Sequence, residues 1–146
     1  MRQLPVWLAA AWAMALTMLG FLVVPMLFVH LPTPAMAGQM AAKLFGAQTW
    51  LSVACGAMLL MTFRSNRQLV PVEYAQAATL FVVAGVLLAL LVELAVAPRI
   101  VARENLAVWH RVGSAMYFAQ WVCALVVLQK MIAALAAQPT SPTDQT

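Results

Sequence analysis

Four long segments of the chain contain no Asp, Glu, Lys or Arg, and this spacing of the charges limits the fold more than any other feature. The charge-free segments are residues 3–42, 44–63, 74–92 and 112–129. A helix needs about 20 apolar residues to cross a hydrocarbon core of about 30 Å, and each segment provides roughly that length. Only 8% of all residues are charged, whereas soluble domains carry about 25%. The sequence therefore predicts an all-α integral membrane protein that crosses the lipid bilayer four times.

The apolar segments and their flanking residues predict four helices with short connections. We expect helices at about 5–29, 35–63, 74–97 and 107–136, forming one transmembrane domain over 1–136, with a disordered polar tail over 137–146. Thr33 is available to cap the second helix, and Pro98 is expected to end the third. Trp7 and Trp12 lie early in the first helix, as in an interfacial aromatic belt. Short connections favour an antiparallel up-down bundle, in which the first and fourth helices are neighbours.

The stretch FVHLPTPAMAGQ (28–39) allows two interpretations. Residues 35–37 read Ala-Met-Ala, a small-x-small pattern that signal peptidases accept. The apolar run before it, from Pro5 to Val29, would extend about 37 Å as a helix, whereas a signal peptide has an apolar region of only about 7–15 residues. We therefore favour a turn between two membrane helices, with cleavage as the alternative.

The formal net charge of +4 fits Arg and Lys at the ends of membrane segments, where headgroups hold them. No basic patch interleaved with aromatic residues indicates binding to nucleic acid. The two ends of the bundle carry equal numbers of these cations: Arg2, Arg64, Arg67 and Lys130 against Lys43, Arg99, Arg103 and Arg111. The positive-inside rule therefore does not choose an orientation. We prefer an orientation with both termini in the cytoplasm, because the polar tail then needs no translocation.

Polar residues gather at one end of the predicted bundle, and we call this set the polar rim. Its members are His30, Glu93, Arg99, Arg103, Asn105 and His110. An acid inside a membrane segment is costly and usually points inward or toward a partner. Glu93 is therefore a candidate site for a proton or cation. The alternative is an interfacial carboxylate paired with Arg99 or Arg103.

The histidines and methionines suggest metal ligation as a further hypothesis. His30 and His110 are candidate ligands for a metal or axial ligands for haem, because neutral imidazole binds transition metals. Two ligands are too few for a closed zinc site, and histidines at headgroup level are the structural alternative. Methionine pairs with i,i+4 spacing suit Cu(I), although such pairs are usually packing or lipid-facing residues. The pairs are Met14 with Met18 and Met36 with Met40. Copper and haem are therefore the candidate cofactors.

Sequence motifs of enzymes are missing from the chain. It contains no H-E-x-x-H, G-x-S-x-G or Walker loop, and its four acids leave little for acid–base catalysis. Cys55 and Cys123 lack a C-x-x-C partner and are expected to be packing thiols rather than a disulfide. The sequence thus predicts a protein without enzymatic activity. Three hypotheses remain: handling of a cation, proton or metal at the polar rim, an accessory subunit packing against a partner or a second copy, and a haem-binding redox subunit.

The stretch PMLFVHLPTPAMAGQMAAKLFG (25–46) resembles the signature of a bacterial membrane family known as domain of unknown function 4149, to which animal transmembrane protein 205 looks related. The matching elements are Leu27–Phe28, Leu31–Pro32, Gly38, Lys43–Leu44–Phe45, Pro98–Arg99, and His110 with Ser114. The likeness covers about residues 15–130. Two positions depart from the family pattern: Arg111 and Val112 separate His110 from Gly113, and Tyr117 stands where Asn is typical. The resemblance implies no established activity, although the animal relative is associated with resistance to a platinum drug, which hints at transport of metal compounds.

Overall fold

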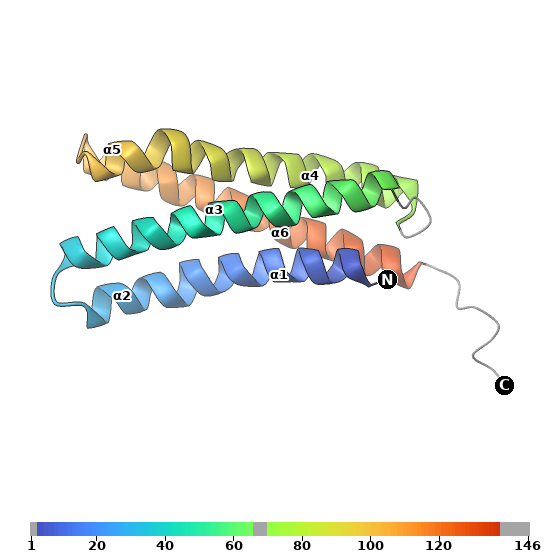
Figure 1. The fold of residues 1–146 in the computed structure, drawn as a ribbon, viewed down its shortest axis with the longest axis horizontal. Coiled ribbons are helices and arrows are strands. Elements are labelled where there is room, and N and C mark those ends of the chain that lie inside the picture. Colours follow the sequence, from blue (N-terminus) through green and yellow to red (C-terminus); the bar gives the residue numbers. More distant parts are fainter. Residues whose placement is uncertain (1–2, 66–69, 138–146) are drawn as a thin grey trace.

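The computed structural model describes residues 3–65 and 70–137, and the described chain forms four long helical spans (Figure 1). The elements are α1 (Leu4–Met18), η1 (Leu19–Val23), α2 (Val24–His30), α3 (Pro34–Ser65), α4 (Val72–Leu91), η2 (Val92–Val96), α5 (Ala97–Val101) and α6 (Leu106–Ala136), where η marks a π-helical segment. The spans have 27, 32, 30 and 31 residues and are long and apolar enough to cross a membrane. The predicted all-α, four-span membrane fold is confirmed.

The spans form an antiparallel up-down bundle. Figure 1 places the α2–α3 and α5–α6 connections at one end, which we call the rim end. The start of α1, the end of α3, the start of α4 and the end of α6 lie at the other end, the terminal end. Helix α1 packs against α3 and α6, and α4 packs against the same two helices. The first and last spans are therefore neighbours, as predicted.

Two prolines continue their helices instead of ending them, and a π segment precedes each one. The Val24 N–H bonds to the Leu19 carbonyl before Pro25, and the Ala97 N–H bonds to the Val92 carbonyl before Pro98. Proline lacks an N–H and clashes with the carbonyl four residues back, and the π turn shifts the bonding of the residue before each proline to i−5. The predicted end of the third helix at 97 is therefore wrong, because the span continues to Val101.

Other helix boundaries differ from the sequence-based bounds by only one or two residues. The second span runs Pro34–Ser65, the third begins at Val72, and the fourth begins at Leu106. The predicted cap is confirmed, since the Thr33 hydroxyl accepts a hydrogen bond of 3.3 Å from the Met36 N–H. Apart from Ala137, the expected disordered tail falls on residues 138–146, which lie outside the described residues.

The core of the bundle is closely packed, and Trp12 is at its centre. Trp12 is fully buried, so its expected place in an interfacial belt is wrong, whereas Trp7 is 67% exposed. Gly85 on α4 makes this burial feasible, because a β-carbon there would lie only 2.7 Å from Trp12 Cη2. Cys55 and Cys123 are free thiols, as expected.

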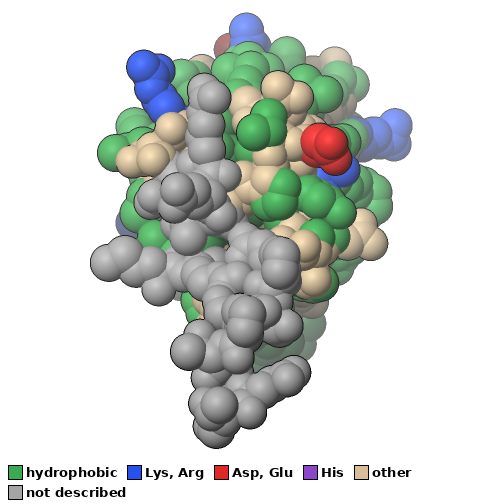
Figure 2. Space-filling model, turned by 90° about the vertical axis from the view of Figure 1, so that its right-hand side faces the viewer, with side chains coloured by type: hydrophobic (Ala, Val, Ile, Leu, Met, Phe, Trp, Pro, Cys, Tyr) green, Lys and Arg blue, Asp and Glu red, His purple; other side chains and the backbone are tan. Residues whose placement is uncertain are grey.

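Lys and Arg side chains lie at the margin of the terminal end. Figure 2 looks onto the terminal end, where Lys and Arg side chains surround a surface that is mostly hydrophobic or uncharged. This distribution is typical of helix ends at a headgroup layer. The paired methionines named above, Met14, Met18, Met36 and Met40, are all exposed on the apolar outer surface.

Candidate functional site

Glu93 lies inside the bundle rather than at its margin. It is part of η2, which packs against α3 and α6, and its side chain is partly buried. A β-carbon built on Gly46 of α3 would lie 3.2 Å from Glu93 Oε1, so the carboxylate occupies space that this glycine leaves open. Because the span continues to Val101, Glu93 is eight residues, or about 12 Å, from its end. The helix extension thus places the carboxylate deeper than a helix ending at 97 would.

The described contacts do not support the alternative that Glu93 forms an ion pair with Arg99 or Arg103. The Arg99 guanidinium lies 4.6 Å from the ring centroid of Trp109 and donates a hydrogen bond to the Ala95 carbonyl of its own helix. Arg103 is exposed in the α5–α6 connection. Within residues 3–65 and 70–137, no ion pair joins Glu93 to either arginine.

Backbone geometry positions Arg103 and Asn105. The Glu104 N–H bonds to the Arg99 carbonyl at 3.0 Å, and the Arg103 N–H bonds to the Ile100 carbonyl at 3.1 Å, which is the Schellman arrangement at a helix C-terminus. Arg103 has φ 58° and Asn105 has φ 40°, so both adopt the left-handed conformation. Their side chains are exposed at the rim end.

His30 and His110 also lie exposed near the rim end. The His30 Nδ1 atom is 3.0 Å from the carbonyl oxygen of Met26, one turn earlier in its own helix. His110 lies in the second turn of α6. In the part of the chain that the structure describes, no three His, Cys, Asp or Glu side chains gather closely enough to hold a metal ion.

A set of hydrogen-bonded polar side chains inside the bundle was not singled out from the sequence, and we call it the polar layer. Its members are Thr17, Gln48, Ser52, Tyr117, Gln120 and Trp121. Ser52 is its hub: it accepts hydrogen bonds from Gln120 Nε2 at 3.0 Å and Gln48 Nε2 at 3.4 Å. The Ser52 hydroxyl donates to the Gln48 carbonyl at 2.9 Å. Ser52 is 0% exposed, Gln120 3% and Gln48 8%.

Tyr117 links the polar layer to the neighbourhood of Glu93. Its hydroxyl donates a hydrogen bond of 2.7 Å to the carbonyl of Leu16, just before η1. Its ring meets Phe45 edge-on with centroids 5.1 Å apart, and Phe45 precedes the glycine that faces Glu93. On the same helix as Tyr117, Trp121 donates to the Thr17 hydroxyl at 2.9 Å. Contacts from the Leu16 carbonyl to Tyr117 on α6, and from Tyr117 to Phe45 on α3, therefore connect the neighbourhood of η1 with that of η2.

The polar layer lies at the middle of the bundle. Ser52 is 18 residues into the 32-residue α3, or about 27 Å along a helix of about 48 Å. Gln120 is 14 residues into the 31-residue α6, or about 21 Å along it. Between this level and the terminal end the core is mainly apolar, with Trp12, Leu59 and Met131 among its buried members. Polar side chains thus extend from the rim end to the midplane of the bundle.

Helical periodicity explains the inward position of these residues once the packed face of each helix is known. Gly113, Gln120, Ala124 and Val127 are all buried on one side of α6, with spacings that keep residues on a common helix face. A polar residue in register with small and apolar core positions points inward, and this pattern applies to Gln48, Ser52 and Gln120. The polar rim, in contrast, is predicted mainly from charged and histidine residues, which in a membrane protein lie near helix ends.

One family model, described as a domain of unknown function (DUF4149), matches residues 7–108. No curated protein and no solved structure matches the chain. The matched region starts earlier and ends earlier than the likeness over 15–130, so Tyr117 and Gln120 lie beyond it. It nevertheless includes the first three spans, both π segments and Glu93, and covers more than half of the sequence. The chain therefore belongs to the DUF4149 family.

Proposed function

We propose that this multi-pass membrane protein has no enzymatic activity of its own and that Glu93 takes up and releases a proton or small cation entering from the rim end. The observation that carries the proposal is the position of the carboxylate, inside the bundle opposite Gly46 and about two turns from the end of its span.

The cost of this position supports a functional role. An acid at the centre of a membrane helix costs about 2.5–3.5 kcal/mol on insertion scales, and a nearer approach to the interface lowers that cost without removing it. The arginines that would have compensated the charge have other contacts or lie in the exposed connection. Glu93 also lies in a π segment, a feature that is frequent at functional sites.

The polar layer provides a continuation for an ion that reaches Glu93. Hydroxyl and amide groups of Tyr117, Ser52 and Gln120 are able to relay a proton or to offer oxygen ligands to a hard cation. The core on the terminal side of this layer is mainly apolar, and the buried Thr62 hydroxyl in that half already donates to the Met58 carbonyl of its own helix. We therefore propose uptake from the rim end to the midplane, with further passage requiring movement of the helices.

Metal ligation by the histidines ranks below this function. Copper or haem ligation by His30 and His110 requires both rings at one centre, whereas the His30 ring contacts the Met26 carbonyl of its own helix. A metal-compound transporter similar to transmembrane protein 205 belongs with this lower-ranked proposal.

An accessory membrane subunit is the second candidate, and an exposed aromatic cluster favours it. Phe21 and Phe118 are 56% and 55% exposed, and both rings contact Trp121, with centroid distances of 5.1 and 5.4 Å. Rigid aromatic surfaces are enriched where proteins associate. Light scattering in detergent would detect a second copy, and the double substitution Phe21→Ala with Phe118→Ala should abolish its association. A monodisperse monomer with both rings intact would remove self-association from this proposal.

Ion flux in proteoliposomes tests the Glu93 proposal. We would load vesicles with a pH-sensitive dye or a sodium indicator, impose a proton or sodium gradient, and compare wild type with Glu93→Gln. Loss of a charge essential to transport should reduce the flux at least tenfold, equivalent to about 1.4 kcal/mol. Glu73→Gln is the matched control, because Glu73 is an exposed acid in the first turn of the same span, and its flux should stay within about twofold. Flux equal in wild type and Glu93→Gln, or no flux above protein-free vesicles, would contradict the proposal.

Orientation decides which compartment the rim end faces. We propose a bacterial inner membrane with the terminal end in the cytoplasm, so that the rim end opens to the opposite side. Fusion of a reporter that is active only in the cytoplasm to the C-terminus should give activity, and a fusion in the α5–α6 connection should not. The reverse pattern would overturn this orientation.

A further inference from the structure

Trp12 reaches across the bundle from one helix to the diagonally opposite one. Helices α1 and α4 each pack against α3 and α6, so α1 and α4 lie at opposite corners. A β-carbon built on Gly85 of α4 would nevertheless lie 2.7 Å from Cη2 and 2.9 Å from Cζ2 of the Trp12 ring. The same β-carbon would lie 3.3 Å from the β-carbon of Cys123 on α6. The Trp12 indole therefore crosses the bundle axis and fills the space between three helices.

The ring lies at the level where the polar layer ends. Trp12 is 18 residues from the end of its span at His30, or about 27 Å from the rim end. Ser52 lies at about the same distance from the rim-end start of α3. Gly85 is 16 residues from the end of its span at Val101, or about 24 Å. Trp12, Ser52 and Gly85 thus share one cross-section of the bundle.

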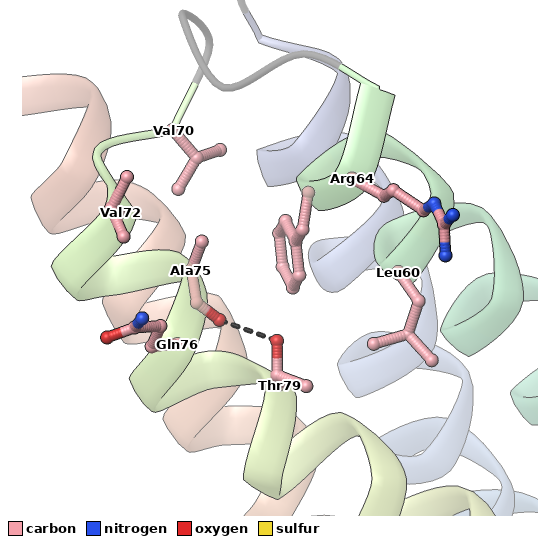
Figure 3. A pocket seen from close by; sticks show the side chains of 8 residues that line it. Leu60, Arg64, Val70, Val72, Ala75, Gln76 and Thr79 are labelled. Atoms are coloured by element: carbon pink, nitrogen blue, oxygen red, sulfur yellow. Dashed lines mark hydrogen bonds between the residues drawn. The ribbon is translucent and has the colours of Figure 1, made fainter.

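Between this cross-section and the terminal end, two threonine hydroxyls bond within their own helices. The Thr62 hydroxyl donates to the Met58 carbonyl at 2.8 Å. Figure 3 shows part of this half, where the Thr79 hydroxyl donates to the Ala75 carbonyl at 2.7 Å and the Arg64 side chain extends away from the space between α3 and α4. The Trp12 ring therefore separates a half with polar contacts between helices from a half in which these hydroxyls are bonded within single helices.

The indole N–H of Trp12 has no hydrogen-bond partner among the described residues. Trp12 is 0% exposed, and its Nε1 atom is buried without an acceptor in that part of the chain. A buried donor without an acceptor is unfavourable, and native structures rarely contain one. A ring position in which the N–H meets water or an oxygen of the polar layer regains this hydrogen bond. The unpaired donor therefore lowers the stability of the packed ring position relative to a hydrated one.

We propose that Trp12 is a gate between the Glu93 site and the terminal end, and that the gate is closed in this structure. The gate rests on the proposed function of Glu93, because it controls the onward passage of an ion that Glu93 takes up. In the closed state, the ring packed on Gly85 keeps water in the polar layer out of the terminal half. Opening moves the ring away from Gly85 and hydrates its N–H, which connects the polar layer with the terminal half for a proton or small cation.

Labelling of Cys55 tests the gate. Cys55 is 3% exposed, belongs to the same core cluster as Trp12, and lies three residues nearer the terminal end than Ser52. Cys123→Ala leaves Cys55 as the single thiol of the chain. A positively charged methanethiosulfonate then reaches Cys55 only through water, because burial of an unpaired charge in an apolar environment is costly. Labelling in proteoliposomes should be slow in this background variant.

Trp12→Ala in the same background should raise the rate of Cys55 labelling about tenfold, because it raises the population of the open state. Two alanine variants are matched controls and should keep the background rate. Trp7→Ala removes an exposed indole from the same helix, and Leu59→Ala truncates another fully buried core residue. The Leu59 control separates a gate from a loosened core.

A second variant keeps the test decisive if Trp12→Ala does not fold by circular dichroism. Trp12→Phe retains an aromatic ring in the core but shortens its reach toward Gly85, and it should raise the labelling rate about threefold. An unchanged rate in Trp12→Phe, or a rate in Leu59→Ala as high as that in Trp12→Ala, would overturn the gate.

Flux measurements separate the gate from the Glu93 proposal. In the proteoliposome assay, Trp12→Ala should raise the flux about tenfold, and addition of Glu93→Gln should abolish the increase. Faster Cys55 labelling without faster flux would contradict a role of Trp12 in ion passage while leaving the Glu93 proposal intact. Flux that Glu93→Gln does not change would contradict the Glu93 proposal, whereas the Cys55 labelling rates would still decide whether Trp12 is a barrier to water.

Discussion

Glu93 on η2 faces Gly46 on α3 at such close range that a β-carbon at position 46 would lie 3.2 Å from Glu93 Oε1. A larger residue at this position would therefore require the carboxylate to shift by a few tenths of an ångström. This contact joins the third span to the second at the level where the polar layer begins. The residue that faces the proposed ion site is therefore a glycine, which has no ionisable group.

Gly46→Ala should weaken ion handling without removing the carboxylate. The added methyl group forces Glu93 to move by a few tenths of an ångström, at a cost of about 1 kcal/mol, which corresponds to roughly a fivefold loss of flux. The proteoliposome assay measures the loss. Gly38→Ala is the control, because a β-carbon at Gly38 of the same helix meets nothing within 4 Å. Equal flux in the two alanine variants would show that the Gly46 contact is unimportant.

Gly85→Ala should destabilise the bundle, and Trp12→Phe should partly rescue it. A β-carbon at position 85 would lie 2.7 and 2.9 Å from two atoms of the Trp12 six-membered ring, and overpacking of this kind costs about 1–3 kcal/mol. Phenylalanine at position 12 lacks the distal ring atoms that approach Gly85. The substitution loses no hydrogen bond, since Trp12 Nε1 is buried without a partner within the described residues. Thermal unfolding of the single and double variants in detergent measures the coupling. Strictly additive losses would indicate that the backbones shift instead.

Ser52→Ala should cost more stability than an ordinary surface substitution. The change removes the acceptor of the Gln120 amide in a fully buried position, and an unsatisfied buried donor costs about 1–3 kcal/mol. Interhelical hydrogen bonds in membranes average about 0.6 kcal/mol, so we expect a loss of about 1 kcal/mol. The double variant Ser52→Ala with Gln120→Leu should be more stable than Ser52→Ala alone. A double variant less stable than either single one would mean that Gln120 has another partner.

Arg103→Gly should stabilise the α5–α6 connection. Arg103 adopts φ 58°, a conformation that costs an L-residue about 1–2 kcal/mol. Glycine removes this cost, but its greater freedom in the unfolded chain offsets part of the gain. The net expectation is about 0.5–1 kcal/mol, visible as a higher unfolding temperature. Arg103→Val should lower the unfolding temperature. If the glycine variant is less stable than wild type, the Arg103 side chain stabilises the protein by more than its backbone conformation costs.

Charge spacing and hydropathy predicted the fold well because a bilayer leaves few alternatives. Any chain with four charge-free segments and short connections is restricted to helices that alternate in direction. The continuation past Pro98 was not predictable from single-residue rules, because the proline effect depends on whether the preceding turn widens. Trp12 was placed at the interface from its position in the sequence, whereas the determining feature is Gly85, 73 residues away.

The candidate site was only partly predictable. Glu93 stood out because a carboxylate in an apolar segment is conspicuous, but its direction depends on Gly46 and on the extension of its span. Tyr117 was regarded only as a departure from the family pattern, and its hydrogen bond to Leu16 depends on a contact between the first and last spans. Neutral polar residues such as Gln48 and Gln120 resemble ordinary helix residues until the packed face of each helix is known.

The two π segments also determine what the rim end presents. Each holds one residue more than the same length of straight α-helix, so the residues beyond it are offset by about 100° from their places in an uninterrupted α-helix of the same sequence. The parts beyond them are α2, which carries His30, and α5, which carries Arg99. Deletion of a single residue within Leu19–Val23 would therefore allow a straight α-helix and leave both Trp12 and His30 in their places, whereas the same deletion outside the π segment would rotate His30 by about 100°. The composition of the rim surface is therefore specified by the π turns within two helices as well as by the rim residues themselves.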